Sequence, residues 1–371
     1  MKTFRVVPQI CQFDSCAEFA EEFQIGEGDV ILTNPTYFER YFKDCTKGAY
    51  VLYARKYGSG EPSDKMVAQI AEELQTVDFR RVIAIGGGSI IDVSKLLVQK
   101  QILPLGDLYD KKIPTQKVKE LVIVPTTCGT GSEVTSVSVI ELTDRGTKMG
   151  LQTDEEFADY AVLIPELLEG LPDKVFATSS IDALIHAVES FLSPKATDFS
   201  EMYSGAAIRM ILSGYRKIRE EGIAARNTYM HDFLLASTYA GIAFGNAGCA
   251  AVHAMSMSFS GPHHVAHGES NYALFTEVLK MYRSLKPDGK LVQLTQMLQE
   301  VLGETESDIY DALDGLLAYL LPKKKLREYG VKEEELPVFV ETVVNCQGRL
   351  TANNYTPLPP EVLLKIYQNV F

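Results

Sequence analysis

The sequence predicts an α/β domain with a parallel sheet over residues 1–172, followed by an all-helical domain over residues 173–371. Two observations predict this order. In the first part of the chain, β-rich runs alternate with helical patterns. After Leu171-Pro172 no strand pattern of similar strength recurs, and segments rich in Ala, Leu, Met and Glu follow. With 371 residues, the chain is long enough for two or three domains of about 150 residues each.

The α/β domain is predicted from six candidate strands: 29–34, 49–54, 81–86, 120–127, 136–142 and 160–165. Helical patterns such as 63–74 and 89–98 separate the first four of these strands. Strands that alternate with helices form parallel sheets that are covered on both faces. This part of the chain therefore predicts a Rossmann-like sheet, in which ligands bind beyond the carboxyl ends of the strands.

Composition excludes several classes of partner. The chain carries 36 Lys and Arg residues against 49 Asp and Glu, so its net charge is −13. Nucleic acids and anionic membranes bind basic faces, and neither partner is expected here. No apolar run reaches the ~20 residues that span a bilayer, and the N-terminus lacks the apolar core of a signal peptide. Six scattered cysteines without a CxxC pair fit a reducing compartment. We expect a soluble, cytoplasmic protein.

The first candidate ligand-binding segment is Gly86-Gly87-Gly88-Ser89, which joins a predicted strand to a predicted helix. Glycines let the backbone approach a ligand closely, and a helix start presents free N–H groups and a positive dipole end. Ser89 can cap this helix, with Asp92 as its capping-box partner. The pattern is neither GxGxxG nor a P-loop, so by itself it fits an ordinary turn as well as a phosphate cradle.

A second segment, VPTTCGTGSEVTSVSV (124–139), comes directly after another predicted strand. It places five hydroxyl side chains around two glycines: Thr126, Thr127, Thr130, Ser132 and Thr135. Since both segments follow strands of one parallel sheet, they can face one bound pyrophosphate. A plain polar turn accounts poorly for so many hydroxyl groups.

The placement of the histidines predicts a metal site. Asp182 and His186 are four residues apart in the predicted helix 179–193, so they share one face. His253 and His267 follow further along the chain. One carboxylate and three imidazoles suit a divalent transition metal better than Mg²⁺ or Ca²⁺, and iron(II) and zinc are the leading candidates.

Simpler interpretations exist for each of these histidines. An isolated Asp-x-x-x-His pair is more often a contact on a helix surface. Sequence spacing alone does not bring residue 186 beside residue 253. His263 and His264 can be loop residues or alternative ligands, and His231 is most simply a solvated or packing residue.

Taken together, GGGSIID, PTTCGTGSEVT, IDALIHAVESF and AVHAM…HHVAHGESN resemble the iron-containing (group III) alcohol dehydrogenases, in order and spacing over essentially the whole chain. Within that family the chain is most similar to the 4-hydroxybutyrate dehydrogenases. The stretches that carry this likeness lie outside the shared motifs: LTNPTYFERYF, KYGSGEPSDKM, YAGIAFGNAG, KKKLREYGVKEEEL and RLTANNYTPL. The resemblance implies a dehydroquinate synthase-like fold and NAD-dependent hydride transfer. It also implies that the catalytic metal is held by Asp182, His186, His253 and His267.

The resemblance further implies that the GGGS loop, with Thr126 and Thr127, holds the pyrophosphate of NAD, and that Thr135 and Lys148 line the cofactor channel. The position that contacts the adenosine ribose falls on Asn34. Many relatives have an aspartate there, which repels the phosphate of NADP, so Asn34 leaves the preference for NAD over NADP open.

A second departure from the family pattern is Met257. Relatives commonly have a histidine at this position, four residues after the third ligand and near the nicotinamide. Since methionine cannot carry a proton, a proton relay in this chain must use the cofactor ribose, water or another side chain.

The resemblance implies a small substrate that carries a carboxylate, in the pair 4-hydroxybutyrate and succinic semialdehyde. Because the net charge repels a carboxylate, its far end needs a cationic or donor-rich partner. The candidates are His263, His264, Lys280 and Arg349. A homodimer is expected, as the commonest symmetric assembly and from the resemblance.

Three alternatives stay open at this point. A zinc-dependent relative like glycerol dehydrogenase or dehydroquinate synthase shares the two-domain plan, but His186 argues for the iron-type branch. The same chemistry can act on another primary alcohol, a diol or lactaldehyde. Only the five stretches that resemble the 4-hydroxybutyrate dehydrogenases argue against this alternative. A non-catalytic NAD-binding protein with a vestigial metal site would show a lost ligand or a broken GGGS loop, and neither is seen.

Overall fold

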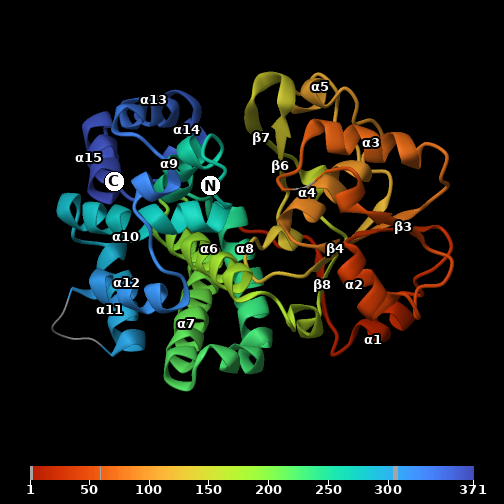
Figure 1. Ribbon diagram of the computed structural model, residues 1–371, viewed down its shortest axis with the longest axis horizontal. Coiled ribbons are helices and arrows are strands. Elements are labelled where there is room, and N and C mark those ends of the chain that lie inside the picture. The colour runs from red at the N-terminus through yellow and green to blue at the C-terminus, as the bar shows by residue number, and fades with distance from the viewer. Residues whose placement is uncertain (1–2, 59, 304–307) are drawn as a thin grey trace. The chain divides into compact units, whose positions relative to one another are not determined.

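The computed structural model describes residues 3–58, 60–303 and 308–371. The chain forms two compact units, Val6–Glu169 and Gly170–Phe371, and the stretch up to Arg5 belongs to the second (Figure 1). We expected the first domain to span residues 1–172. Instead, the N–H of Arg5 donates to Asn246 Oδ1 at 2.8 Å, and the ring of Phe4 stacks on Phe199. These contacts tie the N-terminal stretch to the helical unit.

The first unit contains a six-stranded sheet in the order β1-β8-β5-β4-β2-β3, in which all neighbouring strands are parallel. Its strands are β1 Gln9–Gln12, β2 Asp29–Thr33, β3 Tyr50–Tyr53, β4 Arg81–Gly86, β5 Glu120–Pro125 and β8 Tyr160–Leu163. Strands β2 and β4 are buried along their whole length, which is typical of a parallel sheet covered on both faces. The predicted parallel sheet is confirmed, although β1 was not among the predicted strands.

The strand expected over 136–142 lies outside this sheet. It forms β6 (Val137–Leu142), which pairs antiparallel with β7 (Thr147–Gln152) in a separate two-stranded sheet. The residues of β6 alternate between buried and half-buried, whereas the central strands β2 and β4 are continuously buried. Alternation of this kind is typical of an antiparallel strand with one covered face.

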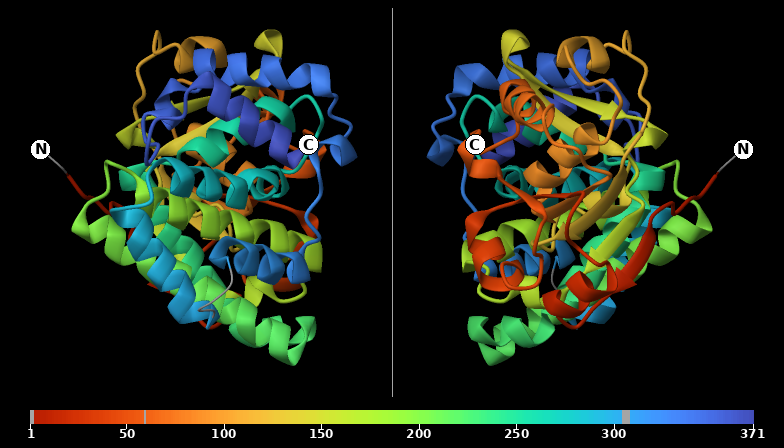
Figure 2. Two further views of the ribbon diagram at one scale, coloured as in Figure 1. Left: turned by 90° about the vertical axis from the view of Figure 1, so that its left-hand side faces the viewer. Right: turned by 90° about the vertical axis from the view of Figure 1, so that its right-hand side faces the viewer.

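The helices of this unit are α1 Cys16–Glu22, α2 Pro35–Tyr37, α3 Asp64–Leu74, α4 Gly88–Leu97 and α5 Leu105–Tyr109, and α4 packs against β2, β4 and β5 of the parallel sheet. Apolar side chains of α3 and α4 join those of the strands in one core cluster, which includes Val67 and Ile91. The right-hand view of Figure 2 faces this unit.

The second unit is helical, and its described residues contain no strand (Figure 2, left). Its helices are α6 Asp173–Leu192, α7 Asp198–Glu221, α8 Met230–Ala247, α9 Ala251–Ser260, α10 His267–Leu285, α11 Lys290–Leu302, α12 Ile309–Leu320, α13 Leu336–Cys346, α14 Gly348–Thr351 and α15 Pro360–Val370. The all-helical prediction is confirmed.

Helix α6 is the central helix of this unit and packs against α7, α8 and α10. By length and composition it could cross a membrane, since its most apolar window has a mean hydropathy of 1.3. The expectation that no apolar run is long enough was therefore wrong. However, 83% of that window is buried, because the neighbouring helices cover it. The segments Ile223–Ala247 and Ala251–Ser260 pass the same test only as a pair bent by 100°.

Packing between α7 and α8 depends on Gly214. A Cβ at this position would lie 2.6 Å from Phe233 Cζ, and Phe233 is itself held edge-on against Phe176. We expect Gly214→Ala to lower the free energy of unfolding by about 1–3 kcal/mol, the usual effect of overpacking a core.

The matched control is Gly315→Ala in α12, where nothing lies within 4 Å of the added Cβ. This change should raise stability by up to about 1 kcal/mol, because alanine favours a helix interior. Denaturant titration of both variants measures the difference, and equal effects of the two changes would contradict the assigned packing.

Candidate metal centre and cofactor loops

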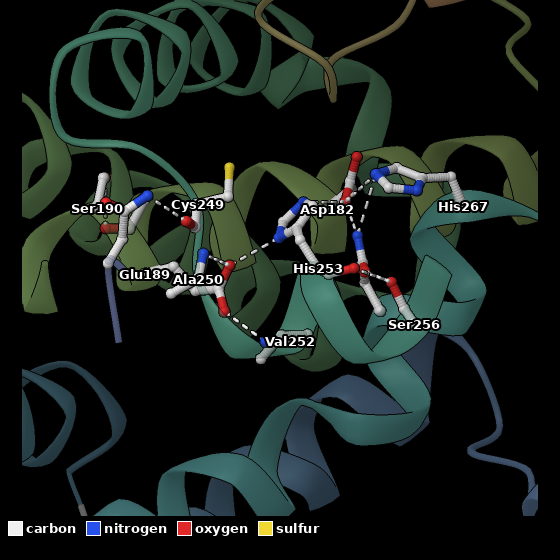
Figure 3. A network of polar contacts seen from close by, with 12 residues as sticks. Asp182, Glu189, Ser190, Cys249, Ala250, Val252, His253, Ser256 and His267 are labelled. Atoms are coloured by element: carbon white, nitrogen blue, oxygen red, sulfur yellow. Dashed lines mark hydrogen bonds and ion pairs between the residues drawn. The ribbon is translucent and has the colours of Figure 1, made fainter. Parts of the chain in front are cut away.

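The structure brings the four predicted metal ligands together within the helical unit. Asp182 and His186 lie on α6, His253 lies on α9, and His267 is the first residue of α10. One ligand atom from each residue lies within 4.8 Å of each of the others. Figure 3 shows Asp182, His253 and His267 pointing toward one another. The fold thus supplies the proximity that sequence spacing could not.

Asp182 Oδ1 lies near two imidazole nitrogens without forming hydrogen bonds to them. Asp182 Oδ1 lies 3.7 Å from His253 Nε2 and 3.8 Å from His267 Nε2, too far for hydrogen bonds. Among the described residues, the buried His253 Nε2 has no hydrogen-bond partner. A buried polar atom without a partner is costly, and a metal ion would satisfy it. The set of one carboxylate and three imidazoles therefore fits a divalent transition metal.

Glu189 holds the ring of His253 in place through its Nδ1 atom. Its Oε2 lies 2.7 Å from His253 Nδ1, and its two oxygens accept hydrogen bonds from the N–H groups of Ala250 and Val252 at the start of α9 (Figure 3). Since a carboxylate can only accept, Nδ1 donates the proton, and Nε2 is left with its lone pair. Burial acts to lower the pKa of His253, but the carboxylates of Glu189 and Asp182 together outweigh burial, and the pKa is raised.

Asn271 supports Asp182 and His267. Its Nδ2 donates to Asp182 Oδ1 at 2.7 Å and lies 3.2 Å from His267 Nε2, while its Oδ1 accepts from Ser256 Oγ. Burial acts to raise the pKa of Asp182, but the three surrounding histidines and the hydrogen bond from Asn271 together outweigh burial, and the pKa is lowered. A lowered pKa favours the ionised carboxylate, the form that binds a metal.

Neither Glu189 nor Asn271 was predicted from the sequence, although both have a positional signal. Glu189 follows His186 by three residues and Asn271 follows His267 by four, so each shares a helix face with a ligand. Glycine at 268 is also required, because a Cβ there would lie 2.1 Å from the carbonyl oxygen of Thr178 on α6.

The remaining histidines lie outside the ligand cluster. His263 Nε2 lies 3.0 Å from Glu335 Oε1. His264 is an exposed residue with φ = 51° in the turn after α9. His231 is exposed beside Asp232. The structure therefore does not place His263 or His264 as alternative ligands.

The two predicted cofactor loops lie side by side in the α/β unit. Strands β4 and β5 pair in the register Gly86↔Pro125, and the N–H of Thr126 donates to Gly86 O at 3.1 Å. A Cβ on Gly88 would lie only 2.9 Å from Thr130 Cγ2, so the close approach of the loops requires glycine there. Asn34 follows β2, which pairs with β4, and so lies at the same edge of the sheet.

The expected capping box of Ser89 and Asp92 was wrong. A capping box of this kind requires Ser89 to be the N-cap, but the N-cap of α4 is Gly87, two residues earlier. Ser89 therefore lies within the first turn, and its Oγ donates to Gly60 O at 3.4 Å. The carboxylate of Asp92 instead accepts from Ser132 Oγ and from the N–H of Val139, both at 3.0 Å. Asp92 thus connects α4 to the hydroxyl-rich loop.

Lys95, which was not predicted, makes the same connection. Its buried Nζ donates to Ser132 Oγ at 2.8 Å, to Thr135 Oγ1 at 3.1 Å and to Val137 O at 2.8 Å. Burial lowers the pKa of Lys95, and the carboxylate of Asp92 acts to raise it. Its signal in the sequence is its position three residues after Asp92.

Lys148, on β7, lies 3.3 Å from Glu61 Oε1 in an ion pair.

Two family profiles match consecutive parts of the chain. The one described as "Iron-containing alcohol dehydrogenase" matches residues 9–165, and the one described as "Fe-containing alcohol dehydrogenase family, C-terminal" matches residues 176–371. The chain belongs to the iron-containing alcohol dehydrogenase family. The resemblance found in the motifs is thereby confirmed.

Individual relatives of this iron-containing alcohol dehydrogenase agree with that assignment. The 4-hydroxybutyrate dehydrogenase of Clostridium kluyveri is 46% identical over 371 residues, which cover 100% of both chains. The long-chain-alcohol dehydrogenase 1 of Geobacillus thermodenitrificans is 33% identical over 302 residues, covering 79% of this chain and 75% of its own.

Solved structures confirm the fold. A 1,3-propanediol oxidoreductase superposes with a TM-score of 0.85 at 23% identity, covering 100% of both chains. The sulfoacetaldehyde reductase of Bifidobacterium kashiwanohense, solved in complex with NAD+, gives a TM-score of 0.85 at 21% identity and covers 100% of this chain and 98% of its own.

We expect Glu189→Gln to weaken metal binding by about 10- to 100-fold, because the amide cannot fix the His253 tautomer as the carboxylate does. Titration of metal-stripped protein with ferrous iron measures the affinity. Glu300→Gln, an exposed change on α11, is the matched control. Equal affinities of the wild type and Glu189→Gln would contradict the role of Glu189.

We expect Lys95→Met to lower the free energy of unfolding by about 1–3 kcal/mol, since it leaves the buried oxygens of Ser132, Thr135 and Val137 without their common donor. Lys100→Met, at an exposed position nearby, should leave stability nearly unchanged. Denaturant titration followed by circular dichroism measures both variants. A wild-type midpoint for Lys95→Met would show that the buried cation does not stabilise the loops.

Proposed function

We propose that the protein is an NAD-dependent 4-hydroxybutyrate dehydrogenase, which interconverts 4-hydroxybutyrate and succinic semialdehyde by hydride transfer. The observation that carries this proposal is the convergence of Asp182, His186, His253 and His267 in a chain that matches a 4-hydroxybutyrate dehydrogenase from end to end. The 46% identity of the two chains extends well beyond the metal and cofactor motifs.

These four residues would hold one divalent metal, iron(II) or zinc. When bound, such an ion supplies a Lewis acid that favours the ionised form of an alcohol and polarises an aldehyde carbonyl. The chain itself prepares the site. Glu189 keeps the proton of His253 on Nδ1, and Asn271 orients the ionised Asp182. Both contacts are buried, so the ligands need little rearrangement to bind an ion.

NAD would bind at the two loops of the α/β unit. The backbone of Gly86, Gly87 and Gly88 and the start of α4 offer N–H groups to a pyrophosphate, with the hydroxyls of Thr126 and Thr127 beside them. Ser89 lies in the first turn of α4.

The other predicted cofactor residues have different roles in this proposal. Asp92 and Thr135 are bonded to protein groups, so we assign them to positioning the loop. We propose that Lys148 lines the cofactor channel and that Asn34 contacts the adenosine ribose. Because Asn34 carries no charge that would repel the phosphate of NADP, both NAD and NADP should be assayed.

Two features of the cellular context belong to the proposal. All the described cysteines are free thiols, which supports the reducing cytoplasm as the compartment. A homodimer is proposed on the general frequency of symmetric dimers. The alternative of a non-catalytic NAD-binding protein is not favoured, because all four ligands and both loops are intact.

The test is an anaerobic assay of NADH oxidation with succinic semialdehyde, on metal-stripped protein with and without ferrous iron. We expect turnover that depends on iron, and His267→Ala should abolish it because one ligand is lost. Near-normal activity of metal-replete His267→Ala would contradict the ligand set. Activity with butyraldehyde or lactaldehyde but not with succinic semialdehyde would show that the substrate is a different aldehyde. No activity with any aldehyde would favour the alternative of a non-catalytic protein.

A further inference from the structure

A substrate that ends in a carboxylate needs a cation near the metal centre, because the chain as a whole carries a net charge of −13. Most cations of the helical unit that are candidates for this role are already paired. Lys280 Nζ lies 2.5 Å from Asp311 Oδ1, and Lys174 and Lys324 both bind Glu269. His263 contacts Glu335, and His264 carries a full charge only when protonated.

Arg349 differs from these cations. It lies on α14, is exposed, and carries a permanent charge. Within residues 3–58, 60–303 and 308–371, no carboxylate lies within ion-pair distance of its guanidinium, and its five N–H donors make no hydrogen bond. Its side chain is therefore available to a ligand from solvent.

Helix α14 is fixed against the segment that carries His253. It packs on α9, and Asn353, one turn after Arg349, donates from Nδ2 to Cys249 O at 2.8 Å and to Arg349 O at 3.4 Å. Gly248 has φ = +81°, and a Cβ there would lie 2.3 Å from Asn353 Nδ2. The contact requires glycine and holds α14 tightly to the turn before α9.

This contact places α14 at the N-terminal end of the helix that carries His253. Cys249, which accepts the hydrogen bond from Asn353, forms a group with Glu189 and His253 in which the ligand atoms lie within 4.8 Å of one another. The exposed side chain of Arg349 therefore extends from a short helix that is fixed beside a proposed metal ligand.

We propose that Arg349 binds the carboxylate of the substrate and selects short aldehydes and alcohols that carry a terminal carboxylate. This inference rests on the proposed function. A guanidinium can hold a carboxylate through two parallel N–H···O bonds, which fixes orientation as well as charge. Arg349 also opens RLTANNYTPL, a stretch outside the shared metal and cofactor motifs, where a residue specific to one substrate is expected.

The experiment compares succinic semialdehyde with butyraldehyde, which has the same chain length and no charge. For Arg349→Met we expect kcat/KM for succinic semialdehyde to fall about 10- to 100-fold, mainly through KM, the effect of losing a charge-assisted hydrogen bond. The value for butyraldehyde should stay within about twofold. For Arg349→Lys, kcat/KM for succinic semialdehyde should lie between the values of the wild type and Arg349→Met. Lysine keeps the positive charge but lacks the two parallel N–H donors of the guanidinium. Arg219→Met, at an exposed position on α7, is the matched control.

Binding of succinate gives a second readout that does not depend on turnover. Calorimetric titration should show about 10- to 100-fold weaker binding to Arg349→Met than to the wild type, and no difference for Arg219→Met. Equal losses with both aldehydes, or unchanged values with both, would overturn the role of Arg349 alone. If the wild type turns over butyraldehyde but not succinic semialdehyde, the proposed substrate falls, and the role of Arg349 falls with it.

Discussion

The hydrogen bond from His253 Nδ1 to Glu189 is the contact on which the helical unit's site depends. The carboxylate of Glu189 binds His253 and also accepts hydrogen bonds from the N–H groups of Ala250 and Val252 at the start of α9. The position of α9 and the proton on the His253 ring are therefore set together. Because α6 carries Glu189 as well as Asp182 and His186, one buried helix determines the orientation of most of the ligand set. The packing of α7, α8 and α10 on α6 is what keeps that helix in place.

Two buried side chains that position loops or helices have hydrogen bonds on all sides: Lys95 has three acceptors, and Asn271 bonds on both its nitrogen and its oxygen. The groups proposed to bind a ligand have an open hydrogen-bonding position instead: Nε2 of the buried His253 has no partner among the described residues, and the guanidinium of Arg349 is exposed. Side chains whose hydrogen bonds are all formed restrict the motion of the neighbouring groups that are left to bind a ligand. Binding sites are usually preorganised in this way.

The order of strands and helices was predictable because burial on both faces leaves continuous apolar runs, as in β4. The metal donors were predictable from their chemistry, since three histidines and an aspartate are an uncommon combination. Glu189 was not, because a glutamate in an apolar helix gives no sign of which N–H groups it will meet. The predicted capping box at Ser89 was wrong because the helix has its N-cap two residues earlier, at Gly87, which changes every capping partner. The pairing of β6 with β7 and the contact of Arg5 with Asn246 depend on tertiary structure that local patterns do not encode.

We propose that Asp182, His186, His253 and His267 bind one divalent metal. The most direct measurement is anomalous X-ray diffraction at the iron absorption edge, from crystals grown anaerobically with ferrous iron. We expect one strong anomalous peak between these four side chains, with His253 bound through Nε2 and its Nδ1 still hydrogen-bonded to Glu189. A peak at another site, or an ordered iron bound without His253, would contradict it.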